Sequence, residues 1–175
     1  MTSTNKNTWV IDPTHSEVLF KVKHMMISTV TGQFDEFEGS VKASNGSFED
    51  GEFAFTAKVA SINTRNGDRD THLKSEDFFD AENHPTINFV SKSFDGETLT
   101  GDLTIRGTTK EVNLDVDFNG VAVDPYGQTK AGFEIEGQIN RKDFNLSWSA
   151  VTEAGNIVVS DKVKLIVAVQ FTKQA

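Results

Sequence analysis

Apolar and polar residues alternate one by one along most of this chain, and this period of two is typical of half-buried β-strands. In the first long run, Val18, Phe20 and Val22 share one face, while lysines and a glutamate occupy the other. The same alternation recurs in the segments 53–61, 86–94, 98–105, 111–118, 130–139 and 162–171. Strands that are apolar on one side are characteristic of antiparallel sheets. The pattern therefore predicts an all-β fold, and both a sandwich and a closed barrel satisfy it.

The alternation changes phase inside the second predicted strand, which covers about residues 30–43. Phe34 occupies an even position, whereas Phe37 and the apolar residues after it occupy odd positions. A shift of one residue moves every following side chain to the opposite face of a sheet. We therefore predict a β-bulge at Asp35 and Glu36, where an extra residue would restore the inward direction.

Residues 61–85 form a long segment without this alternation, rich in charged residues. Asn66 is a suitable cap for a short helix that reaches about Ser75. Phe78 and Phe79 stand next to each other between acidic residues, so we expect at least one of them to be buried. Connecting segments on rigid scaffolds often carry function, which makes this insertion a candidate lid.

Length, charge and cysteine content limit the class of protein. The 175 residues suit one domain, which we assign to residues 1–175. The net charge of −9 argues against nucleic acid and against anionic membrane surfaces as partners. There is no cysteine, and no apolar run is long enough to form a transmembrane helix. The start of the chain has no apolar signal region, so we expect a soluble cytoplasmic protein, or a periplasmic one if a leader precedes it.

The aromatic content indicates either a phenylalanine-rich core or a dry cavity, because the chain has 14 Phe but only two Trp and one Tyr. Small residues alternate with Phe and Leu on several predicted faces, at Gly39, Ala57, Gly101, Ala131 and Gly137. They would either leave a channel or let bulky neighbours interdigitate, and the pattern alone favours interdigitation.

Polar candidates are few. His24 shares a face with apolar residues and could be a hydrogen-bonded core histidine or a polar contact for a mostly apolar ligand. The insertion offers possible metal ligands or an acid–base pair in His72, Asp77, Asp80 and His84. Their spacing matches no compact metal motif, and most charged residues in surface insertions are simply solvated. A hydrolase or metal-dependent enzyme that uses these side chains is therefore an alternative, and so is a structural or stress-related module with a filled barrel.

Four segments resemble the YceI-like, polyisoprenoid-binding family. They read WVIDPTHSEVLFKVKHMMISTVTGQFDEFEG, RDTHLKSEDFFDAENHPTINF, LTGDLTIRGTTKEVNLDV and DPYGQTKAGFEIEGQINRKDFNLSW, and together they span nearly the whole chain in order. One departure is Asn145, where the family usually has glycine after Asp-Phe. Asparagine tolerates a positive φ better than most residues, so we expect the turn to survive.

The resemblance implies an eight-stranded antiparallel, lipocalin-like β-barrel with a short helical insertion. It also implies a hydrophobic pore for a long isoprenoid chain, such as a quinone tail or another lipid. The resemblance implies no catalysis. We expect no cofactor or metal, and a homodimer is one assembly that we consider. Two criteria together nominate the pore-lining residues: parity, meaning whether a residue takes an odd or an even position along its strand, and the resemblance. The nominated residues are Phe20, Val22, His24, Met26, Phe34, Phe37, Phe55, Phe78, Phe89, Leu103, Phe118 and Phe133. The leading hypothesis is thus a carrier that binds an isoprenoid or fatty-chain lipid.

Overall fold

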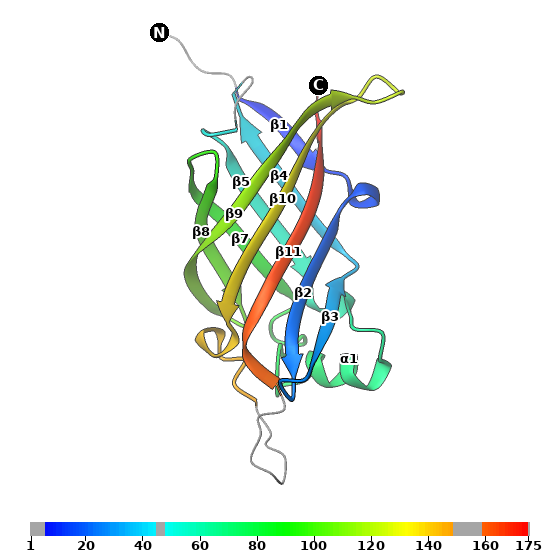
Figure 1. Ribbon diagram of the computed structural model, residues 1–175, viewed down its shortest axis with the longest axis vertical. Coiled ribbons are helices and arrows are strands. Elements are labelled where there is room, and N and C mark those ends of the chain that lie inside the picture. Colours follow the sequence, from blue (N-terminus) through cyan, green and yellow to red (C-terminus); the bar gives the residue numbers. More distant parts are fainter. Residues whose placement is uncertain (1–5, 45–47, 149–158, 175) are drawn as a thin grey trace.

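Eleven strand segments follow one another in the computed structural model, which describes residues 6–44, 48–148 and 159–174. They are β1 Asn7–Ile11, β2 Glu17–His24, β3 Ser28–Phe34, β4 Phe37–Ala43, β5 Glu52–Lys58, β6 Ile62–Asn63, β7 Thr86–Phe94, β8 Thr98–Ile105, β9 Thr108–Val123, β10 Thr129–Asn140 and β11 Val159–Lys173. All neighbouring segments pair antiparallel, in the order β1-β4-β5-β7-β8-β9-β10-β11-β2-β3-β6. Figure 1 shows them wrapped around a common axis.

These segments amount to eight long strands, because three strands are each interrupted once. A 3₁₀ turn, Pro13–His15, separates β1 from β2, and a second one, Val59–Ser61, separates β5 from β6. Asp35 and Glu36 separate β3 from β4. The last strand, β11, pairs with β10 and with both β1 and β2, which closes the sheet on itself. The predicted eight-stranded antiparallel barrel is therefore confirmed.

The prediction of a β-bulge at Asp35 and Glu36 is wrong, although the apolar alternation does change phase there. The strand ends there and begins again, with β3 pairing β2 and β6 while β4 pairs β1 and β5. The additional residues belong to the opposite strand, as the turn Val59–Ser61. The N–H of Asp35 donates to the carbonyl of Ser61 at 3.1 Å, so the two interrupted strands stay joined.

The insertion contains the predicted helix, α1 Gly67–Lys74. Its cap is Asn66, whose side chain accepts a hydrogen bond from the N–H of Arg69 at 3.0 Å. Among the described residues no helix is long and apolar enough to cross a membrane. After the helix, Phe78 is buried and Phe79 is partly buried, as expected for adjacent aromatic residues beside the barrel.

An aromatic plug, formed by Trp9, Phe48, Phe118 and Phe133, fills one end of the barrel interior. The ring of Phe48 lies 5.0 Å from that of Phe133 and 5.2 Å from those of Trp9 and Phe118. This end carries the start of β1, the end of β11 and the β9–β10 hairpin, whereas α1 and the β2–β3 hairpin lie at the opposite end (Figure 1). The interior is thus packed solid near the termini, and any open space lies toward α1.

Candidate ligand cavity

An apolar cavity of about 200 Å³ occupies the barrel between the aromatic plug and the insertion. Its walls are Phe, Val, Leu and Ile side chains from the inward faces of most strands. Among the lining residues, Ser40 and Arg141 are the only ones with polar side chains. The volume far exceeds what one water molecule needs, and the lining offers very few groups to hold water. Such a cavity suits an apolar guest.

Seven of the nominated residues line this cavity, and they come from strands β2, β3, β5, β7 and β8 and from the insertion. They are Phe20, Val22, Phe34, Phe55, Phe78, Phe89 and Leu103. Parity placed the strand residues correctly, because alternate side chains of a strand point to the same side of the sheet. Whether they contact a ligand stays a prediction.

The other five nominated residues lie outside the cavity. Phe118 and Phe133 belong to the aromatic plug, where their rings stack at 5.0 Å. Met26 is 66% exposed at the tip of the β2–β3 hairpin, because the chain reverses there and parity no longer applies. Phe37 packs against Phe55 with the ring centroids 6.1 Å apart, and His24, the last residue of β2, does not line the cavity.

Sequence reasoning missed part of the lining because it favoured aromatic residues. The inward residues of β11, Val163, Leu165 and Val167, line the cavity and follow the same alternation, so parity alone would have found them. Leu73 and Leu146 also line it, from α1 and from the segment after β10. No period of two marks these two positions, so only the tertiary fold reveals them.

Glycines let aromatic rings lie flat against the barrel wall. A Cβ atom on Gly32 would lie 2.2 Å from the ring of Phe20, and one on Gly101 would lie 2.6 Å from the ring of Phe89. A Cβ atom on Gly137 would similarly meet Leu114. The small residues therefore interdigitate with bulky neighbours, as the pattern favoured, and the space inside the barrel remains because the rings lie on the wall.

Arg141 forms one end of the cavity and is almost completely buried. Its guanidinium donates to the carbonyls of Leu146, Trp148, Val159 and Ser160, with Nε at 3.0 Å from the last. Burial lowers the pKa of this group, and the carboxylate of Asp161, 3.7 Å away, opposes that shift. These bonds occupy most of the donors of Arg141, so it acts mainly as a structural clamp beside the cavity.

The candidate catalytic groups of the insertion do not converge. His72 pairs with Asp77 at 2.8 Å, and its ring packs edge-on against Phe78 and Trp148. Asp80 instead accepts hydrogen bonds from the side-chain amide of Asn83. Within residues 6–44, 48–148 and 159–174 no three His, Asp or Glu side chains are grouped so as to hold a metal ion. The arrangement therefore supplies no metal centre there.

Comparisons with known proteins agree along nearly the full length. A UPF0312 protein of Staphylococcus epidermidis is 36% identical over 162 residues, which cover 92% of this chain and 95% of the relative. A UPF0312 protein of Staphylococcus aureus is 37% identical over 165 residues, covering 94% of this chain and 96% of the relative.

Solved structures share the barrel. The YCEI protein of Campylobacter jejuni is 35% identical, with a TM-score of 0.73 over 87% of this chain and 90% of that chain. A polyisoprenoid binding domain from Saccharophagus degradans has a TM-score of 0.70 at 14% identity over 95% of this chain and 98% of that chain, which shows the fold alone. The model of the YceI-like domain matches residues 9–171. With the closed barrel and these relatives, the chain belongs to the YceI-like family.

Proposed function

We propose that this protein is a non-catalytic carrier that holds part of an isoprenoid or another long-chain lipid in the barrel cavity. The observation that carries the proposal is the chemistry of the lining, which is apolar except for Ser40 and Arg141. A guest that needs hydrogen bonds would lose them there, and each unpaired polar group is costly. A neutral hydrocarbon chain loses nothing of that kind. The polyisoprenoid binding domain from Saccharophagus degradans has the same fold, which supports this class of ligand.

The expected affinity follows from the number of buried carbons. Each buried CH₂ contributes about 0.8 kcal/mol, so one five-carbon isoprene unit contributes about 4 kcal/mol. Association itself costs at least about 4 kcal/mol in lost translational and rotational freedom. Three buried units would therefore leave at most roughly 8 kcal/mol, which corresponds to binding no tighter than about micromolar. A chain shorter than two units would scarcely bind.

The size of the cavity limits how much of a chain it encloses. Its volume of about 200 Å³ is below the about 300–1,000 Å³ typical of pockets that surround a drug-sized ligand. The aromatic plug fills the remainder of the interior near the termini. We therefore infer that a long lipid is held along part of its length, and that its other end stays outside the barrel on the side of α1.

Native mass spectrometry after gentle extraction tests this function. We expect the purified protein to retain an apolar lipid, and Val167→Phe, which fills the cavity with an apolar ring, to reduce the retained fraction strongly. The matched control is Ile166→Phe on the same strand, because Ile166 does not line the cavity. Equal retention by both variants would show that the lipid does not occupy the cavity. Retention of no lipid by the wild type, together with failure to take up added farnesol, would favour the filled-barrel alternative.

A further inference from the structure

The tip of the β2–β3 hairpin is apolar and exposed, at the end of the barrel away from the aromatic plug (Figure 1). Met26 and Ile27 are 66% and 79% exposed. The N–H of Ile27 donates to the carbonyl of His24 at 3.1 Å, which closes a two-residue turn around Met25 and Met26. The tip therefore consists of three consecutive apolar residues, 25–27, of which Met26 and Ile27 are exposed.

This turn is conformationally unfavourable for its residues. Met25 and Met26 have φ values of 50° and 60°, in the left-handed region that residues with a Cβ atom rarely adopt. Turns with positive φ at both central positions strongly prefer Asn-Gly. The chain instead carries two methionines there: Met25 is partly buried, whereas Met26 is 66% exposed and gains little from packing inside the protein. An external apolar environment would account for both the strain and the exposure.

A groove beside the tip is lined by four exposed lysines, although the whole chain has a net charge of −9. Lys21 and Lys23 come from β2, and Lys162 and Lys164 come from β11. Lys21 and Lys164 are direct cross-strand partners, an arrangement that is destabilising for like charges.

Within the residues that the structure describes, the charge of this groove is not neutralised. In the described part of the chain none of its four lysines forms an ion pair. Asp161 is the only acidic residue among those lining the groove, and it lies 3.3 Å from Lys142 and 3.7 Å from Arg141. Among the described residues, the groove thus presents a positive surface without acidic ion-pair partners next to an apolar tip.

We propose that this docking surface, formed by residues 25–27 and the four groove lysines, binds the surface of a bilayer that contains anionic lipids. Apolar side chains of the tip would enter the interfacial region, and the lysines would contact the acidic headgroups. The net charge of the chain argues against an anionic bilayer as a partner. Electrostatic attraction acts only within about a Debye length, however, so the charges close to the bilayer matter more than the sum over the whole chain. The inference rests on the proposed function, because a carrier of a bilayer lipid has to exchange its cargo with a membrane.

Other features of the barrel are consistent with this orientation. The aromatic plug closes the opposite end, so the cavity lies nearer to the docking surface. Of the two acidic residues of α1, Asp70 accepts hydrogen bonds from the backbone and the hydroxyl of Thr64.

The opposite end of the barrel provides a matched comparison. Its β9–β10 hairpin also exposes apolar residues, with Val123 67% and Tyr126 90% exposed. There the turn contains Asp124, whose carboxylate accepts hydrogen bonds from two backbone N–H groups, and the neighbouring Lys130 is bound to Asp12. Apolar exposure without free lysines should not suffice for binding to a charged bilayer.

Co-sedimentation of the full chain with vesicles tests the proposal. We expect binding to vesicles that contain one-third phosphatidylglycerol, little binding to pure phosphatidylcholine, and release by salt. Lys162→Gln and Lys164→Gln should each weaken binding roughly fivefold. Wild-type protein that binds neither kind of vesicle would overturn the proposal, and so would equal binding to both.

The decisive variant replaces the strained turn by its preferred sequence, Met25→Asn together with Met26→Gly. This change should make the protein at least as stable, because both residues favour positive φ, yet reduce vesicle binding at least tenfold. Val123→Asn in the other hairpin should leave binding unchanged. Vesicle binding by the turn variant at the wild-type level would refute the role of the tip. Native mass spectrometry of the same variants in detergent separates the two proposals, since docking variants should keep their lipid.

Discussion

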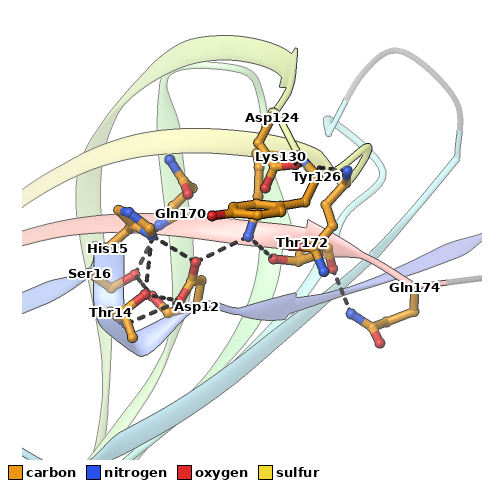
Figure 2. A network of polar contacts seen from close by, with 11 residues as sticks. Asp12, Thr14, His15, Ser16, Asp124, Tyr126, Lys130, Gln170, Thr172 and Gln174 are labelled. Atoms are coloured by element: carbon orange, nitrogen blue, oxygen red, sulfur yellow. Dashed lines mark hydrogen bonds and ion pairs between the residues drawn. The ribbon is translucent and has the colours of Figure 1, made fainter.

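The Nζ atom of Lys130 lies 3.1 Å from Oδ2 of Asp12, although 118 residues separate them in the sequence. The same Nζ donates to the hydroxyl of Thr172 at 2.7 Å, and Figure 2 shows the lysine reaching both partners. Asp12 precedes the first 3₁₀ turn, Lys130 lies on β10, and Thr172 lies on β11. This network joins the interrupted first strand to the last two strands, where the barrel closes.

Asp12 should make stability depend on acid. Hydrogen bonds from His15 and Thr14, with a further one from Lys130, hold the pKa of Asp12 well below its usual range. A lowered pKa in the folded state stabilises the protein above the unfolded value of about 3.9, and this contribution is lost as the pH falls below it. Asp12→Asn should therefore lower the free energy of unfolding at pH 7 by about 1–2 kcal/mol, with a smaller difference near pH 3.

Urea unfolding at the two pH values measures this difference. Asp102→Asn is the control, because Asp102 is 41% exposed and lies 3.4 Å from Lys92 in a surface ion pair, which contributes less than about 1 kcal/mol. If the difference in the free energy of unfolding between the wild type and Asp12→Asn stays the same at both pH values, the acid sensitivity does not arise from Asp12.

Gly101 should tolerate no side chain. A Cβ atom there would lie 2.6 Å from both the ring of Phe89 and the carbonyl oxygen of Val90. The ring can move only into the cavity, and the backbone oxygen can scarcely move. Gly101→Ala should cost about 1–3 kcal/mol of stability and weaken lipid binding. Gly132→Ala is the matched control, because its nearest contact would be Asn119 at 3.7 Å, and thermal unfolding with a lipid-uptake assay compares the two.

The aromatic plug should contribute stability rather than ligand contacts. Phe133 is 1% exposed and contacts the rings of Phe48, Phe53, Phe118 and Phe171. Phe133→Ala should therefore lower the free energy of unfolding by about 3–5 kcal/mol in a denaturant titration. Phe118→Ala should cost clearly less, because Phe118 is 40% exposed. Similar losses for the two variants would mean that the plug does not pack as the structure has it.

Chain length of the ligand should determine affinity up to a limit. Isothermal titration with the alcohols geraniol, farnesol and geranylgeraniol should give dissociation constants that fall with each added isoprene unit while carbons still enter the cavity. Once the cavity is full, a further unit should change the affinity little, because it remains in water. Affinity that is independent of length from the shortest alcohol upward would argue against burial of the chain in the barrel.

Much of the site could be predicted from the sequence because parity is a local property. Phe20, Phe55 and Phe89 point inward for the same reason that alternate residues of any strand share a face. The cap at Asn66 and the left-handed turn at Asn145, with φ 62°, are equally local, since each depends on one side chain and its own backbone. The position of a residue along the barrel axis is not a local property. Parity therefore could not distinguish Phe133, which lies in the plug, from Phe89, which lines the cavity.

The sequence by itself determined the all-β class, the inward face of most strands and the helical insertion, because hydrophobic periodicity and capping act over a few residues. Tertiary structure alone decided which inward residues surround empty space, since that depends on strand register and on Phe48, a loop residue that folds over one end. It also decided the burial of Arg141, whose partners are mostly backbone carbonyls. Every sequence has such carbonyls, so no pattern of side chains could indicate in advance which cation they would bind.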